Sequence, residues 1–499
     1  MILNKSSYLG QPQALLQANF KPGTCLGAQG VNHIMTLAQN AVIAKGYTTS
    51  RILAAPQNLN TGELTLTVVP GLIGQIRIDK SDDPADTAGR IASFPNKFPT
   101  TAGDILNLRS LEQGLENLKR VPTADADIQI IPGAAPNESD VVIRWKQRLI
   151  PYRLALSLDD SGSTATGKYQ GNLTFSADNP LGLSDLFYIS SGRGLAHSSS
   201  YTDSSGHTTG SGSKSLAVHY SVPFGNWLAA FNHSRYRYHQ AVAGDSEIYD
   251  YNGEKFTSDI GLTRLLHRTA HGKSYASVKL WESESHSFIN DAEISVQHRK
   301  TAGWELGLSH KEYINQASVN LSAAYKRGTG AAGSIPAPEE AYGEGTSRMK
   351  ILTVDADVNL PFSIRQKKLA YDTSLHSQWN KSPLTQLDKI AIGGRYTVRG
   401  FDGDLTLAAE RGWYWRNDLS WQYVPGHSVY VGADIGHVSG SSSAQLAGRT
   451  LAGGVVGLKG QLKAGGNLYY DAFVGTPFIK PEHFQAAKVV PGFSLNYAF

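Results

Sequence analysis

Residues that could carry out a reaction are few in this sequence. The run Gly162-Ser-Thr-Ala-Thr-Gly167-Lys168 has the glycine and lysine spacing of a phosphate-binding loop, but Tyr169 stands where a Ser or Thr must bind the metal. No helical pattern follows this run, which lies in a turn between alternating segments. The histidines are scattered, and neighbours such as His233 and His239 lack metal-ligand spacing. We therefore expect no nucleotide hydrolysis, no metal site, no cofactor and no enzymatic activity.

Arg399 and Asp434 are the charged residues in the most distinctive surroundings. Arg399 belongs to Ile392-Gly-Gly-Arg-Tyr-Thr-Val-Arg-Gly-Phe401, inside a long connection at 381–412, and Asp434 belongs to Gly432-Ala-Asp-Ile-Gly436. An enclosed guanidinium can bind a carboxylate through two parallel hydrogen bonds, and flanking glycines let a loop approach a wall closely. The alternative is an ordinary loop arginine and a solvated carboxylate. Because an ion pair in a wet site adds little stability, we expect such a pair to hold a loop conformation.

The composition favours β-structure over a helical enzyme. The chain has 499 residues, a formal net charge of +4, and 51 glycines and 23 tyrosines against 3 methionines, which suits turns and half-buried strands. No window holds about 18 consecutive apolar residues, so a bundle of transmembrane helices is excluded. The nearly balanced charge offers no concentrated basic surface for nucleic acid. The single Cys25 excludes an intrachain disulfide and a cysteine-based zinc site, and we expect it to be a small buried hydrophobic residue.

The first 148 residues predict two consecutive α+β modules, at 1–71 and 72–148. In the first module a helical apolar face ends at Gly46, and residues 63–69 alternate as a strand. In the second, a leucine stripe marks a helix at 108–120. Strands are predicted at 75–78, 127–131 and 140–145. Two units of one plan indicate a tandem repeat of small domains.

The remaining residues, 149–499, predict a mainly β fold that closes as an antiparallel transmembrane barrel. About sixteen alternating segments recur between Gly, Ser, Asn and Asp clusters, which gives about 22 residues per strand and connection. Short turns such as 178–185 alternate with longer loops at 243–255, 328–346 and 381–412, as periplasmic turns and external loops do in outer-membrane barrels. A soluble β-sandwich is the alternative, because alternation also describes a sheet with one wet face.

The distribution of aromatic residues favours the barrel. In the segment 413–423, Trp413, Trp415, Leu419 and Trp421 share one face, as expected for a lipid-facing row with aromatic girdles. The last segment, Phe493-Ser-Leu-Asn-Tyr-Ala-Phe499, also alternates strictly. Since a closed barrel has no free edge, we expect this last strand to pair with the first.

The tetrapeptide Val398-Arg399-Gly400-Phe401 resembles the hallmark of the two-partner secretion transporters (TpsB proteins) of Gram-negative outer membranes. These are the transporters of the filamentous haemagglutinin, haemolysin and contact-dependent growth inhibition (CdiB-like) type. Their tetrapeptide lies at the tip of the sixth extracellular loop, which folds back into the barrel. Gly432-Ala-Asp-Ile-Gly436 resembles a second motif of the family. The resemblance covers most of the chain, since Val69-Pro-Gly71, residues 106–120 and Asn179-Pro-Leu-Gly182 are similar to its two POTRA domains and first periplasmic turn.

The resemblance implies roles for individual residues. Arg399 would pair with Asp434 on the inner barrel wall, and Val398, Gly400 and Phe401 would complete this loop-locking and secretion motif. The implied supporting residues are Gly394 and Tyr396 in the loop and Gly432 and Gly436 in the wall, and the implied membrane-targeting C-terminus contains Tyr497 and Phe499. The alternation independently supports the inward position of Asp434. Val431 and Ala433 belong to the apolar face of the strand, so Asp434 belongs to the opposite face, which points into the lumen.

The resemblance also implies a function without chemistry. Two periplasmic POTRA domains would bind an unfolded cognate TpsA exoprotein as an added strand, and a 16-stranded outer-membrane barrel would export it to the cell surface. The client would be an adhesin, a haemolysin or a contact-dependent inhibition effector. Outer-membrane lipid and, during biogenesis, the barrel-assembly machinery are further expected partners, and the protein is expected to be monomeric. The alternatives are a barrel-assembly factor of the same superfamily, which usually has more POTRA domains, and a passive porin or barrel enzyme.

The beginning of the sequence departs from the family pattern. Residues 1–5 lack the basic and apolar stretches of a signal peptide, which fits either a cytosolic chain or a processed one with an added Met1. Members of the family usually have a plug helix and a linker before the first POTRA strand, and many have a second cysteine. We expect this sequence to begin after the plug helix and linker, as an N-terminally trimmed chain would. We expect residues 1–4 to be the tail of that first strand.

Overall fold

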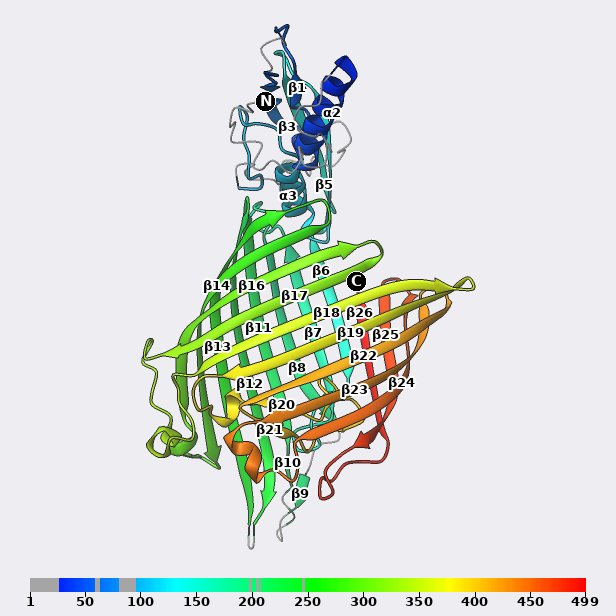
Figure 1. Ribbon diagram of the computed structural model, residues 1–499. Helices are drawn as coiled ribbons and strands as arrows, with labels where there is room; N and C mark the ends of the chain where they lie inside the picture. The colour runs from blue at the N-terminus through cyan, green and yellow to red at the C-terminus, as the bar shows by residue number, and fades with distance from the viewer. Residues whose placement is uncertain are drawn as a thin grey trace. The chain divides into compact units, whose positions relative to one another are not determined.

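The computed structural model describes residues 27–58, 63–79, 96–196, 200–202, 206, 208–244 and 247–499 (Figure 1). They form two compact units. Unit 1 contains Met1–Pro151 with Asp178–Asp185 and Val222–Trp227, and unit 2 contains Tyr152–Ala177, Leu186–Ser221 and Leu228–Phe499. Among the described residues, no helix has both the length and the apolar character needed to cross a bilayer. The predictions for Cys25 and for residues 1–4 lie outside the described residues.

The first module of unit 1 combines one helix with a two-stranded sheet. Helix α2 (Ala28–Ala44) buries Ile34 and Val42, as its apolar spacing predicts. Strand β1 (Arg51–Leu53) pairs antiparallel with β2 (Thr67–Val69). The predicted strand at 63–69 is therefore too long at its start. The reason is local, because the Gln57 side chain bonds both backbone groups of Thr65, at 2.7 and 2.9 Å, in place of a neighbouring strand.

The second module packs one helix on a three-stranded sheet. Its elements are β3 (Leu72–Asp79), α3 (Leu108–Lys119), β4 (Ala124–Pro132) and β5 (Glu138–Gln147). The strand order is β3-β5-β4, with β3 parallel and β4 antiparallel to β5. Asn107 caps α3, because its side chain accepts a hydrogen bond from the Arg109 backbone N–H. Leu111 and Leu118 are buried against Val141 and Ile143 of β5, so the leucine stripe predicted from the sequence faces the core.

Unit 2 is a closed antiparallel barrel of sixteen long strands within the described residues, as predicted. In chain order, these are β6 (Tyr152–Asp159), β7 (Tyr169–Asp178), β8 (Leu186–Ala196), β11 (Gly212–Phe224), β12 (Trp227–Ala243), β13 (Ile248–Arg268), β14 (Gly272–Ile289), β16 (Arg299–Ile314), β17 (Ala317–Thr329), β18 (Lys350–Ile364), β19 (Lys367–Asn380), β22 (Arg411–Val424), β23 (His427–Ser439), β24 (Thr450–Lys463), β25 (Asn467–Ile479) and β26 (Val490–Ala498). A two-residue strand, β15 (Ala292–Glu293), adds to β14, and β9 (Ser200–Thr202) pairs with β10 (Thr208–Gly210).

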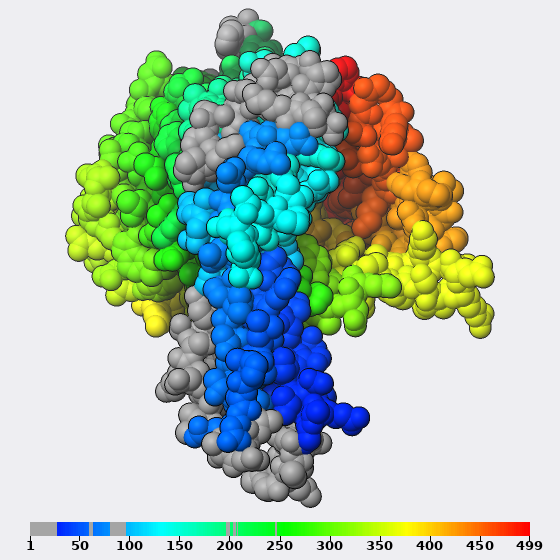
Figure 2. All heavy atoms as spheres, turned by 90° about the horizontal axis from the view of Figure 1, so that it is seen from above, coloured from blue at the N-terminus to red at the C-terminus, as the bar shows by residue number. Residues whose placement is uncertain are grey.

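The barrel closes through its first and last strands. β26 pairs with β6 from Ser494 opposite Asp159 to Ala498 opposite Ala155, which confirms the predicted closure. Neighbouring strands follow one another in the sequence, so the colours in Figure 2 run around the wall from green through yellow to orange and red. The β6–β26 ladder has five residue pairs, whereas the β13–β14 ladder has seventeen.

The faces of the strands alternate as the sequence predicts. In β22, Trp415, Leu419 and Trp421 are exposed on the outside, while Ser420 between them is buried on the inside. The long loop predicted at 243–255 is wrong, because β12 continues to Ala243 and β13 begins at Ile248. These residues remain in strands because β13 pairs with β14 as far as Tyr251 opposite Ile289.

Two connections between neighbouring strands pack within unit 1. The fully buried Lys97 donates from Nζ to the Gly182 carbonyl and to Asn96 Oδ1, both at 2.9 Å. Asn117 of α3 donates from Nδ2 to the Gly225 carbonyl at 2.8 Å. Side chains of the second module thus satisfy main-chain carbonyls of the β7–β8 and β11–β12 connections, which would otherwise be buried without partners.

Candidate functional site

The connection between β19 and β22, residues 381–410, forms a hairpin that carries Arg399. Strand β20 (Ile390–Ile392) pairs antiparallel with β21 (Leu407–Ala409). The tip at 393–406 lies between these two short strands and contains the tetrapeptide 398–401. Because the hairpin fixes both ends of the tip, the tetrapeptide is held at a defined place against the barrel wall.

The apolar members of the tetrapeptide anchor the tip. Val398 and Phe401 are completely buried in a cluster with side chains of the hairpin and of the wall. The wall contributes Val438 of β23 and Leu451 of β24 to this cluster, and the Phe401 ring meets Phe484 edge to face at 5.9 Å between centroids. Burying two such side chains is worth about 1.5–3 kcal/mol each relative to exposure, so apolar packing alone gives the tip a preferred position.

The Arg399 guanidinium lies between two carboxylates of adjacent strands. It donates from Nε and Nη2 to Asp434 of β23 at 2.7 and 2.8 Å. It also donates from Nη1 and Nη2 to Asp418 of β22 at 3.1 and 2.7 Å. Arg399 is 4% exposed and Asp434 is 3% exposed. The pair is therefore not a wet surface contact but a buried, bidentate ion pair with a second carboxylate beside it.

Arg416 balances the charge of this cluster. In the β22–β23 ladder, Arg416 stands opposite Asp434, and Asp418 stands opposite Gly432. The Arg416 Nε lies 3.9 Å from Asp434 Oδ2, and its Nη1 donates to the Tyr396 carbonyl at 3.3 Å. Two guanidinium groups thus face two carboxylates. Removing any one of these four charged groups leaves an opposite charge without full compensation, and for a buried charge this costs about 3–5 kcal/mol.

Glycines of the wall make room for the tip. A Cβ on Gly432 would lie 2.9 Å from Arg399 Nη2, and one on Gly436 would lie 2.9 Å from Val398 Cγ2. Both distances are too short for ordinary van der Waals contact. Gly432 and Gly436, on either side of Asp434, are therefore two positions where the wall must have no side chain.

The backbone of the tip also contacts β24 and β25. Gly400 has φ +96°, a conformation that favours glycine, and a Cβ there would overlap the backbone of Thr476. A Cβ on Gly453 would overlap the Arg399 carbonyl, and one on Gly475 would lie 2.9 Å from Gly400 Cα. No motif or spacing in the sequence points to Gly453 or Gly475.

The other predicted residues lie outside the buried cluster. Tyr396 has a side chain that is 64% exposed, and its role in the cluster is limited to its carbonyl. The Gly394 carbonyl accepts a turn hydrogen bond from Thr397 at 3.0 Å. At the other end of the chain, Tyr497 donates to the Ala464 carbonyl at 3.0 Å, and Phe499 is 72% exposed while its N–H bonds the Leu154 carbonyl.

A second ion pair ties the tip to the barrel closure. Arg395 Nη1 donates to Asp160 Oδ1 at 2.5 Å, and both side chains are largely buried. The same Asp160 oxygen accepts the backbone N–H of Phe493 in β26 at 2.8 Å. Asp160 was not predicted, because it has no motif around it. The contacts of Arg416 and Asp418 with the loop were not predicted either, although both residues belong to the inward row of β22.

Comparisons with known proteins agree with this architecture. The family model of the haemolysin secretion/activation proteins ShlB/FhaC/HecB matches residues 137–460. A POTRA domain model matches residues 72–132, and a ShlB-type POTRA domain model matches residues 7–71. The outer membrane transporter CdiB-2 of Burkholderia pseudomallei strain 1026b is 38% identical over 96% of this chain and 79% of its own length.

Two solved structures resemble the whole fold. CdiB from Acinetobacter baumannii has a TM-score of 0.82 and 31% identity, covering 98% of this chain and 88% of that one. CdiB from Escherichia coli has a TM-score of 0.84 and 25% identity, covering 100% of this chain and 89% of that one.

Barrel, modules and buried loop together define a class of protein, the outer-membrane β-barrel transporters of Gram-negative bacteria with periplasmic POTRA domains. The chain belongs to the ShlB/FhaC/HecB family of two-partner secretion transporters and is most like CdiB in the comparisons above. It is an outer-membrane transporter of TpsA exoproteins and not an enzyme.

Proposed function

We propose that this transporter exports one cognate TpsA exoprotein in an unfolded state, and that Arg399 locks the loop at 381–412 in the conformation that secretion requires. The observation that carries the proposal is the burial of Arg399 between Asp434 and Asp418. Val398, Gly400 and Phe401 would form the rest of the lock, with Gly432 and Gly436 as its wall. Gly394 and Tyr396 would support the loop.

The lumen wall supports passage of an extended, hydrated chain. A cavity on the inner side of β13 to β17 is lined by charged residues of both signs, among them Lys255, Asp259, Lys279, Glu305 and Lys326. Lys279 and Glu305 form an ion pair at 3.0 Å across the β14–β16 ladder. Such a mixed surface offers hydrogen-bond donors and acceptors to a peptide backbone.

The two modules at 1–71 and 72–148 would receive the client in the periplasm. Within the described residues, β3 and β4 are the outer strands of the three-stranded sheet. A strand of the client could add to such an edge through main-chain hydrogen bonds, which give affinity without a strict sequence requirement. The segment 149–499 would then act as the pore.

The remaining partners follow from the barrel surface. Leucine, valine and tryptophan side chains are exposed along the outward faces, for example Leu308, Val431 and Trp415, and would contact outer-membrane lipid. The C-terminal strand with Tyr497 and Phe499 would be the part that the barrel-assembly machinery recognises during biogenesis. The closed barrel would act as a monomer, because it has no free edge to pair with a second copy.

The test is to delete the gene and restore it as wild type, Arg399→Ala or Arg411→Ala. Arg411 is the control, since it is exposed at the start of β22 and bonds Asn380. We expect one large protein to disappear from the medium on deletion and to return with wild type and Arg411→Ala only. All three barrels should insert, as judged by heat-modifiable migration in gels. Normal secretion by Arg399→Ala would overturn the locking role, and loss of many outer-membrane proteins on deletion would overturn the single client.

A further inference from the structure

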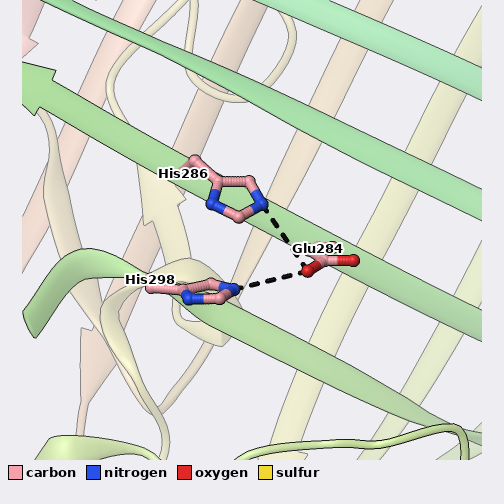
Figure 3. A group of neighbouring side chains, drawn as sticks. All are labelled: Glu284, His286 and His298. Atoms are coloured by element: carbon pink, nitrogen blue, oxygen red, sulfur yellow. Dashed lines mark hydrogen bonds and ion pairs between the residues drawn. The ribbon is translucent and has the colours of Figure 1, made fainter. Parts of the chain in front are cut away.

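Glu284, His286 and His298 meet at one end of the β14–β16 hairpin (Figure 3). A second glutamate, Glu293, lies beside the two histidines. Glu284 and His286 are two residues apart in β14 and therefore point to the same side of the strand. His298 follows the short helix η3 (Ser295–Gln297) and precedes β16, and Glu293 belongs to β15. The connection at 290–298 folds back on β14, so it brings together residues that have no motif spacing.

This end of the hairpin lies beyond the lipid-spanning part of the wall. β14 begins at Gly272, directly after the short turn that follows β13, and short turns lie on the periplasmic side of such barrels. A strand needs about 9–11 residues to cross the membrane, and His286 lies further along β14 than that. The four side chains are only partly buried, at 23–39% exposure, so ions of the external medium can reach them.

The donor atoms have the spacing of a metal site. Glu284 Oε1 lies 3.5 Å from His286 Nε2 and 3.3 Å from His298 Nε2. One ligand atom from each of the three residues lies within 4.8 Å of the others. Zinc binds imidazole nitrogen and carboxylate oxygen at about 2.0–2.2 Å, so the edge of a tetrahedral site is about 3.3 Å. The two distances from Glu284 Oε1 therefore already match the edge of such a site.

A second carboxylate orients the imidazole rings. Glu293 Oε1 lies 2.8 Å from His286 Nδ1 and 3.8 Å from His298 Nδ1. A carboxylate that accepts a hydrogen bond from Nδ1–H leaves the lone pair on Nε2, which faces Glu284. Lys300 Nζ bonds the other Glu284 oxygen, Oε2, at 3.1 Å. That contact reduces the negative charge of the site but leaves Oε1 as a single ligand atom.

We propose that Glu284, His286 and His298 bind a Zn²⁺ ion, with water in the fourth position and Glu293 as the positioning residue. Two imidazoles and one carboxylate suit zinc and exclude the hard cations Ca²⁺ and Mg²⁺, which take oxygen ligands. The bound ion joins β14 to the segment before β16 and so fixes the external connection at 290–298. This role is separate from the proposed action of Arg399 in the lumen.

The test is metal binding by the full chain, purified in detergent without a histidine tag and stripped with a chelator. Zn²⁺ is titrated against a chromophoric indicator, and Co²⁺ is added separately for its visible absorption. The expected result is one equivalent of bound Zn²⁺ and the intense bands of tetrahedral Co²⁺. His286→Ala and His298→Ala should each weaken binding at least about tenfold, and Glu293→Gln should weaken it less because it touches no metal.

His310→Ala is the matched control. His310 lies in β16 of the same hairpin and also neighbours a glutamate, with Nε2 3.2 Å from Glu312, but it belongs to no three-ligand group among the described residues. The His310→Ala variant should bind Zn²⁺ with the same affinity as the wild type. Heat-modifiable migration shows for each variant that the barrel is folded. The absence of a stoichiometric site, or equal affinity in wild type and His298→Ala, would overturn the proposal.

Discussion

Asp434 binds both the side chain and the main chain of Arg399. Its Oδ2 accepts a hydrogen bond from the Arg399 Nε at 2.7 Å and another from the Arg399 backbone N–H at 3.0 Å. The same carboxylate therefore fixes the position of the loop backbone as well as the direction of the guanidinium. A lysine at this position would keep the charge but could not reproduce the planar, bidentate arrangement.

The two carboxylates that hold Arg399 are expected to differ in importance. The Asp434 side chain is 1% exposed and also bonds the loop backbone, whereas the Asp418 side chain is 21% exposed. We expect Asp434→Asn to destabilise the loop position by about 3–5 kcal/mol, because the buried Arg399 guanidinium and the partly buried Arg416 guanidinium then share one carboxylate. Asp418→Asn should cost less, since water partly solvates this position. Asp434→Asn should therefore reduce secretion of the client more than Asp418→Asn does.

A double-mutant cycle distinguishes direct pairing from general damage. If Arg399 and Asp434 act as a unit, the loss of secretion in Arg399→Ala combined with Asp434→Ala should be no larger than in the worse single variant. Additive losses in the double variant would contradict the pairing role.

Gly453→Ala should displace the loop without changing any charge. A Cβ at position 453 overlaps the Arg399 carbonyl, so the tip must move away from β24 even though Arg399, Asp434 and Asp418 are intact. Gly261→Ala in β13 is the control, because its Cβ meets nothing closer than the Val278 carbonyl at 3.9 Å. We expect the Gly453 variant to secrete poorly and its residues 393–406 to be cut faster by added protease. Equal cleavage in both variants would show that the tip does not depend on this close approach.

Asp160→Asn should weaken the closure of the barrel. Asp160 joins Arg395 of the loop to the Phe493 N–H of β26, next to the five-pair ladder between β6 and β26. The neutral amide loses the ion pair, which is largely buried, and leaves the Arg395 charge without its partner. The temperature at which the barrel loses its heat-modifiable migration should therefore fall. Asp159→Asn is the neighbouring control, since the Asp159 side chain accepts a hydrogen bond from the local Ser161 N–H, and this variant should melt like the wild type.

The sequence predicts those parts of the molecule that depend on local pattern. Alternation identified the barrel strands, their facing and the closure of the last strand on the first, and leucine spacing identified α3. Sequence pattern could not predict contacts between residues that are distant in the sequence. Arg395 and Asp160 meet only because the loop folds back toward the barrel closure, and Gly453 matters only because the Arg399 carbonyl lies above it. His286 and His298 meet because the connection between β14 and β16 turns back on β14. Their spacing in the sequence does not predict this contact either.

Lys97 should make the stability of unit 1 depend on pH. Burial lowers the pKa of the Lys97 ammonium to about 8, and the nearby Asp185 carboxylate offsets this only in part. In the unfolded chain the group keeps its ordinary pKa of about 10.4. Between about pH 8 and pH 10.4, Lys97 is protonated more often in the unfolded state than in the folded state. The free energy of unfolding therefore rises with pH in this range. Below about pH 8 the lysine is protonated in both states, and the folded state bears the full cost of the buried charge.

The measurement is pulse proteolysis of the full chain in urea, which reports unfolding of unit 1, at pH 7.5, 8.5 and 9.5 for wild type, Lys97→Met and Lys119→Met. Lys119 is the control, because it is half exposed and pairs with the exposed Asp125. The wild type and Lys119→Met should gain stability relative to Lys97→Met as the pH rises, since only they contain the buried amine. At pH 7.5 Lys97→Met still loses the hydrogen bond to the Gly182 carbonyl, which costs about 1–3 kcal/mol. Parallel pH curves for wild type and Lys97→Met would show that Lys97 does not titrate in this range.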